Sequence, residues 1–178
     1  MSIMLDVRDL LGSPGDSRRV VVAEPVAGLE LPLARVPADR AIEARLLLEN
    51  VVEGLLVSGP VRGVMVVDCA RCLKPVEWPF HMDVRELFIP RAVEGLDAYL
   101  LADGEVDLEP MIRDAVVLAM PYSPLCRADC LGLCPRCGSD RNEGPCDCGP
   151  EIDDRWSALS VLTLPEPLRE PTLESPPN

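Results

Sequence analysis

Residues 41–50 read AIEARLLLEN and carry the clearest structural signal in the chain. Apolar side chains occupy every second position, namely Ile42, Ala44, Leu46 and Leu48. Charged residues stand between them, at Glu43, Arg45 and Glu49. A two-residue period is typical of a strand with one face toward a core and the other toward water. The segment therefore predicts a half-buried strand.

Two further apolar runs extend this sheet toward the C-terminus. Residues 55–67 form one run, and residues 76–84 alternate like the first strand. Gly59-Pro60 interrupts the earlier run, so a bulge or kink is expected there because proline cannot donate to a ladder. Cys69 and Cys72 fall between the two runs, which places this pair at a reversal between strands.

Helical spacing appears in a later segment, which predicts a helix over residues 107–120. Its apolar positions are Leu108, Met111, Ile112, Ala115, Val116 and Ala119. Asp107 is a suitable N-cap and Pro121 ends the run. We expect this helix to lie across the sheet.

The predicted fold is α+β, with a mostly antiparallel, strongly curled sheet, one main helix and a Cys-rich, zinc-binding C-terminal extension. At 178 residues, one core with a small metal-bound appendage fits the length. The expected parts are an extended N-terminal arm with short strands (1–40), a β-rich core with the helix (41–125), a Cys-rich zinc segment (126–150), a short helix (151–162) and a disordered tail (163–178).

The eight cysteines form four short pairs. These are Cys69 and Cys72, Cys126 and Cys130, Cys134 and Cys137, and Cys146 and Cys148. Eight thiolates suffice for two tetrahedral zinc sites of four ligands each, and such closed sites are structural. The sequence therefore predicts one or two structural zinc ions.

Two partitions of the cysteines remain open at this point. One joins the first two pairs around one ion and leaves the last two pairs for a second, local site. The other places Cys126, Cys130, Cys134 and Cys137 around one ion. Spacing bounds such pairings without settling them.

Other roles for the cysteines are less favoured. The chain shows no signal-peptide pattern and no apolar run long enough to span a membrane, so we expect a cytoplasmic protein with no membrane contact, where disulfides are rare. A thioredoxin-like motif would begin a helix, whereas a strand is expected after Cys72. A thiol redox or zinc-reservoir protein remains an alternative.

Catalytic patterns are also missing from the sequence. His81 is the single histidine and falls on the outward face of the 76–84 strand. The sequence contains neither a phosphate-binding glycine loop nor a nucleophile elbow. We therefore expect no enzyme and no small-molecule substrate.

The charge balance disfavours free nucleic acid as the main partner. The formal net charge is −13, and residues 91–125 carry seven acidic and two basic side chains. Each phosphate contact requires a cation, so RNA binding would depend on local basic patches. Arg127, Arg136 and Arg141 in the Cys-rich segment are the candidates for such a patch.

Three motifs of the chain belong together, namely Cys69-Ala-Arg-Cys72-Leu-Lys-Pro-Val76, Leu118-Ala-Met-Pro121, and the segment from Pro124 through Cys126, Cys130, Cys134 and Cys137 to Gly138. Together they resemble the YceD family of bacterial large-subunit ribosomal RNA accumulation proteins. The early segment from Leu5 to Gly12, followed by Pro14-Gly15, is similar to the actinobacterial branch of that family.

The resemblance implies a non-enzymatic role in ribosome biogenesis that supports accumulation of 23S ribosomal RNA. The family pattern carries over to the first six cysteines, while Cys146 and Cys148 match a less uniform part of it. The acidic charge favours a basic ribosomal protein or a pre-ribosomal particle as partner, with residues 94–114 as a candidate contact. Direct binding of large-subunit RNA by a zinc knuckle is the alternative.

Overall fold

The computed structural model describes residues 2–149 together with Arg155 and Leu159. The chain divides into two compact units, Met1–Pro145 and Cys146–Asn178. The predicted helix at 151–162 and the tail at 163–178 lie outside the described residues, apart from Arg155 and Leu159.

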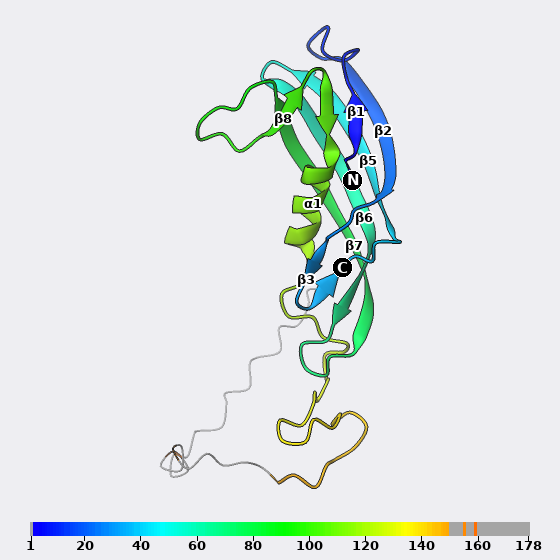
Figure 1. Ribbon diagram of the computed structural model, residues 1–178, viewed down its shortest axis with the longest axis vertical. Coiled ribbons are helices and arrows are strands. Elements are labelled where there is room, and N and C mark those ends of the chain that lie inside the picture. The colour runs from blue at the N-terminus through cyan, green and yellow to red at the C-terminus, as the bar shows by residue number, and fades with distance from the viewer. Residues whose placement is uncertain (1, 150–154, 156–158, 160–178) are drawn as a thin grey trace, which may run out of the picture. The chain divides into compact units, whose positions relative to one another are not determined.

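The first unit is built on a nine-stranded sheet and the helix α1 (Figure 1). Its elements are β1 (Met4–Asp6), β2 (Ser17–Pro25), β3 (Glu30–Leu31), β4 (Ala34–Arg35), β5 (Ala41–Val51), β6 (Gly54–Asp68), β7 (Pro75–Ile89), β8 (Tyr99–Ala102), β9 (Glu105–Asp107) and α1 (Leu108–Ala119). The main path of the sheet is β1-β9-β8-β7-β6-β4-β3, and β5 joins β6 to β2.

The alternating pattern of residues 41–50 forms β5 as expected. Ile42, Ala44, Leu46 and Leu48 are each at most 1% exposed. The intervening side chains lie on the other face, where Glu43 accepts hydrogen bonds from Arg45 and Arg62. Period-two patterning therefore fixes which face of this strand enters the core.

The sheet is mixed, which corrects the expectation of a mostly antiparallel one. The chain passes from β7 through residues 90–98 and returns in the same direction, so β8 pairs parallel to β7. The other strand pairings are antiparallel, including the long β6–β7 ladder. Parallel pairing requires a longer connection than a hairpin turn, and the nine residues of this loop supply it.

Gly59 and Pro60 interrupt the ladder between β6 and β5 but not the ladder between β6 and β7. Pairing with β5 is present at Ser58 and resumes at Val61 in the same register, so no extra residue is inserted. Pairing with β7 continues through both residues. Gly59 has φ +142°, and a Cβ there would lie 2.2 Å from the carbonyl oxygen of Arg45. Only glycine fits at this position.

Residues 1–40, expected as an extended arm with short strands, supply four strands and part of the core. β2 pairs with β5 along its whole length. The side chains of Val7, Leu10, Val26 and Leu29 are at most 4% exposed. Strand pairing and burial thus join this segment to the sheet.

α1 lies against one face of the sheet and begins at the predicted cap (Figure 1). The Asp107 carboxylate accepts hydrogen bonds from the backbone N–H groups of Glu109 and Ile3, each at 3.0 Å. The helix buries Leu108, Met111, Ile112 and Val116 in the core. Among the described residues, no helix has both the length and the apolar character needed to cross a membrane.

Candidate metal centre

Cys69 and Cys72 lie on the turn between β6 and β7. The Leu73 N–H donates to the Cys69 carbonyl at 2.8 Å, and the Cys69 N–H donates to the Lys74 carbonyl at 3.0 Å. The Arg71 N–H also points at the Cys69 sulfur, at 3.5 Å. This loop presents both thiols on one side and directs a backbone donor at one of them.

The segment 134–139 repeats the same hydrogen-bond pattern. The Gly138 N–H donates to the Cys134 carbonyl at 2.9 Å, and the Cys134 N–H donates to the Ser139 carbonyl at 2.8 Å. Cys134 and Cys137 therefore occupy the positions that Cys69 and Cys72 hold in the first loop. Both C-x2-C pairs form the same knuckle, the arrangement that structural zinc sites use for half of their ligands.

The residue after the second cysteine has a positive φ in both knuckles. Gly138 has φ 73° and Leu73 has φ 59°. This conformation costs a residue with a Cβ roughly 1–2 kcal/mol, whereas glycine adopts it freely. Leu73 is also 58% exposed, so it contributes little to packing.

We expect Leu73→Gly to raise the free energy of unfolding by about 0.5–1 kcal/mol, since relief of strain exceeds the added entropy of the unfolded chain. Chemical denaturation of the metal-loaded protein would measure this change. Leu73→Ala is the matched control, because it removes the exposed side chain but keeps the Cβ and its strain. A glycine variant no more stable than the alanine variant would contradict the proposed strain.

Four thiols from distant parts of the chain converge beside the first knuckle. The sulfurs of Cys69, Cys72, Cys126 and Cys130 all lie within 4.8 Å of one another. The Cys69–Cys130 separation is 3.8 Å and the Cys72–Cys126 separation is 3.6 Å. Four sulfurs about 2.3 Å from a tetrahedral zinc ion would be about 3.8 Å apart, so the geometry fits that ion.

These distances do not fit disulfide bonds. A disulfide requires an S–S distance near 2.05 Å. None of the eight cysteines, all of which lie in the described part of the chain, is joined to another by a disulfide. The thiols of Cys69, Cys72, Cys126 and Cys130 can therefore serve as ligands of a metal ion.

Protein packing encloses this cluster. Cys69 and Cys130 are at most 1% exposed. The Ala70 N–H donates to the Pro124 carbonyl at 2.8 Å, which holds the knuckle against the segment that follows α1. The Asn142 amide donates to the Cys130 sulfur at 3.5 Å. A closed, hydrogen-bonded thiol set is characteristic of a structural site.

The ionisation of Cys69 and Cys126 also favours a bound cation. Burial opposes ionisation of Cys69, but backbone N–H groups, that of Cys126 first, outweigh it and lower the pKa of this thiol to about 6. Burial and hydrogen bonds to the neighbouring thiols raise the pKa of Cys126 to about 12. Four thiolates can share this space only when a positive ion balances their charges.

A polar cluster that the sequence does not signal joins the two knuckles. The Lys74 ammonium forms ion pairs with Asp140 at 2.7 Å and Glu143 at 2.8 Å. The hydrogen bond from Lys74 lowers the pKa of Asp140 to about 2. Lys74 is the single lysine of the chain, but nothing in the local pattern indicates partners nearly seventy residues away.

The remaining four cysteines stay a predicted second ligand set. Cys134 and Cys137 belong to the first unit, while Cys146 and Cys148 open the second. Their type and number suit one further ion. The convergence of the first four cysteines corresponds to the first of the two partitions that the spacing left open.

The three arginines proposed for RNA contact are exposed. Arg127 pairs with Asp129 at 3.3 Å and donates to Asn142 at 2.8 Å. Arg136 lies on the second knuckle, and Arg141 lies just after it. Acidic neighbours accompany these arginines, so the segment does not form a purely basic surface.

Comparison with known proteins identifies relatives of this chain. A family model described as Large ribosomal RNA subunit accumulation protein YceD matches residues 57–163. An uncharacterized protein of Mycobacterium tuberculosis (strain ATCC 25618 / H37Rv) is 37% identical over 146 residues, which cover 79% of this chain and 70% of that protein. An uncharacterized protein of Mycobacterium leprae is 31% identical over 171 residues, or 92% of this chain and 79% of that protein.

A plant relative carries a functional name. It is the Large ribosomal RNA subunit accumulation protein YCED homolog 1, chloroplastic, of Arabidopsis thaliana. It is 39% identical over 133 residues, which cover 57% of this chain and 41% of the plant protein. No solved structure matches the chain.

Proposed function

The chain belongs to the YceD family of large ribosomal RNA subunit accumulation proteins, and on this premise we propose that it is a non-enzymatic factor in the assembly or protection of the large ribosomal subunit. In this proposal it supports accumulation of 23S ribosomal RNA by binding a basic ribosomal protein or a precursor particle. Its cysteines hold structural zinc, which ties the β6–β7 turn to the segment after α1.

The charge of the chain is the observation that favours a protein partner over free RNA. The formal net charge is −13 before any metal is counted. Each zinc held by four thiolates contributes −2, so two such ions lower the charge to about −17. A strongly acidic protein is repelled by phosphates and attracted to basic proteins. This attraction raises the rate at which the two proteins associate.

The proposal predicts a specific loss in cells. Depletion of the protein from a bacterium that encodes it should lower the ratio of 23S to 16S ribosomal RNA, measured by quantitative electrophoresis of total RNA. Re-expression of the chain should restore this ratio. An unchanged ratio on depletion would contradict the proposed role in accumulation.

Direct RNA binding is tested by reversing the three exposed arginines. We expect the Arg127→Glu, Arg136→Glu, Arg141→Glu variant to restore the RNA ratio, because binding through a protein partner does not require these cations. The purified chain is also expected to bind ribosomal proteins in a pull-down from cells, after which the bound RNA and the bound proteins are both identified by sequencing. Salt-dependent binding to large-subunit RNA that disappears in the triple variant would instead establish the RNA-binding alternative.

A further inference from the structure

A solvent-open cavity lies where α1 meets the end of β7 and the start of β8. Its volume is about 420 Å³, which lies within the range of ~300–1,000 Å³ that is usual for ligand pockets. Met111, Ala115 and Leu118 of α1 contribute apolar surface to it. The metal centre described above shares no residue with this cavity.

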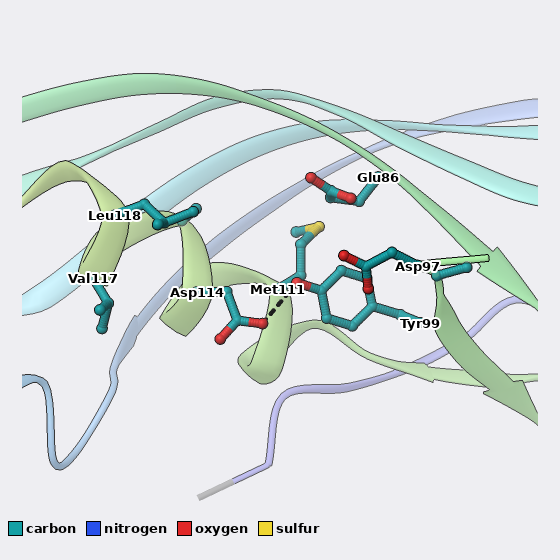
Figure 2. A pocket seen from close by; sticks show the side chains of 9 residues that line it. Glu86, Asp97, Tyr99, Met111, Asp114, Val117 and Leu118 are labelled. Carbon is teal, nitrogen blue, oxygen red and sulfur yellow. Dashed lines mark hydrogen bonds between the residues drawn. The ribbon is translucent and has the colours of Figure 1, made fainter. Parts of the chain in front are cut away.

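Three carboxylates from three different elements face the same cavity (Figure 2). Glu86 comes from β7, Asp97 from the loop before β8, and Asp114 from α1. None of the nine described residues that line the cavity is basic. The structure therefore gathers negative charge over an apolar floor, with no cation among the described lining residues.

Tyr99 fixes the position of one of these carboxylates. Its ring stacks on Phe88 with a centroid distance of 5.2 Å, and its hydroxyl donates to Asp114 at 2.8 Å. Burial and this hydrogen bond raise the pKa of Tyr99, and the charges of Glu86 and Asp97 add to the rise. Asp114 is thus held in place. The carboxylates of Glu86 and Asp97 form no hydrogen bond or ion pair with any of the described residues.

Exposed apolar side chains continue beside the acidic cavity. Leu118 is 87% exposed although it lines the cavity, and Leu96, next to Asp97, is 48% exposed. A surface that combines apolar and acidic groups in this way suits an arginine side chain. The aliphatic stem of an arginine packs on apolar surface, while its guanidinium donates to carboxylates.

We propose that this cavity is the docking site for a basic, leucine-containing segment of a protein partner, with one arginine of that segment inserted between Glu86, Asp97 and Asp114. Charge complementarity and the apolar wall of Leu118 together select a peptide over a metal ion, which would not use the apolar surface. The proposal rests on the proposed function, and it specifies where the basic partner binds.

The test titrates the full-length, zinc-loaded protein with a synthetic twelve-residue peptide of alternating arginine and leucine. A peptide with glutamine in place of each arginine is the ligand control. We expect the arginine peptide to bind and to shift the NMR resonances of Tyr99 and Met111. We expect the Glu86→Gln, Asp97→Asn double variant to weaken this binding about tenfold, because two of the three charges facing the guanidinium are removed.

Matched variants separate the cavity from general electrostatic attraction. Glu24→Gln with Asp39→Asn removes the same charge from exposed positions and should leave the affinity within about twofold, because neither carboxylate lines the cavity. Leu118→Ser keeps every carboxylate and should also weaken binding, since the apolar wall is lost. Equal effects of the two double variants would overturn the proposal, as would tighter binding of spermidine or Ca²⁺ than of the peptide.

The same variants distinguish this site from the broader function. If the Glu86→Gln, Asp97→Asn variant binds the arginine peptide normally while depletion still lowers 23S ribosomal RNA, the docking site is wrong and the proposed function stands. If depletion leaves the RNA unchanged, the proposed function fails whatever the peptide binds.

Discussion

Cys72→Ser is expected to remove one zinc ion per chain and to destabilise the protein by more than about 4 kcal/mol, the scale associated with loss of a structural metal. Cys72 lies on the β6–β7 turn and is 5% exposed. Its sulfur is 3.6 Å from that of Cys126, which follows α1 in the chain. Loss of this thiol is therefore expected to release the link between the sheet and the segment after the helix.

Cys146→Ser is the matched control for this variant. Cys146 lies outside the unit that contains the sheet, so its replacement should leave the unfolding of the sheet nearly unchanged. Native mass spectrometry would count the zinc ions, and urea unfolding followed by the fluorescence of Trp78 on β7 would report on the sheet. Equal destabilisation by both substitutions, or an unchanged zinc count in Cys72→Ser, would contradict the role assigned to the first site.

Sequence patterns predicted those features that depend on local periodicity. The alternation in residues 41–50 predicted β5 and its buried face, and the helical spacing with Asp107 predicted α1 and its cap. The short cysteine spacings left two partitions open, and the convergence of Cys69, Cys72, Cys126 and Cys130 corresponds to one of them. Each of these patterns can be recognised within one short segment, or from the preference of a metal ion for thiolate ligands.

Features that depend on distant contacts were not predictable in the same way. The parallel pairing of β8 with β7 depends on how the loop 90–98 returns, which no periodicity encodes. The cavity beneath Glu86, Asp97 and Asp114 arises because three elements meet. The left-handed conformation of Leu73 was hidden because glycine, the usual marker of such a position, is absent there.

Gly59→Ala is the second substitution with a large expected effect. The new Cβ would lie 2.2 Å from the Arg45 carbonyl oxygen, and the φ of +142° is one that alanine rarely adopts. Overpacking and backbone strain together should lower the free energy of unfolding by about 3–5 kcal/mol. Gly12→Ala is the control, because a Cβ at Gly12 meets nothing within 4 Å. Similar stabilities for the two variants would show that β5 and β6 do not approach as closely as described.

Zinc content should separate this effect from that of the metal centre. The β6–β7 ladder continues from Gly59 to the Asp68–Pro75 pair, next to Cys69, so the knuckle does not depend on the β5 contact at Arg45. We therefore expect Gly59→Ala to retain its full zinc content under native conditions while unfolding at lower urea concentration. Cys72→Ser should lose both metal and stability. Gly59→Ala strains the sheet, whereas Cys72→Ser removes a predicted ligand. Zinc loss from Gly59→Ala would therefore contradict this separation and would mean that the close approach of β5 to β6 also positions the thiols.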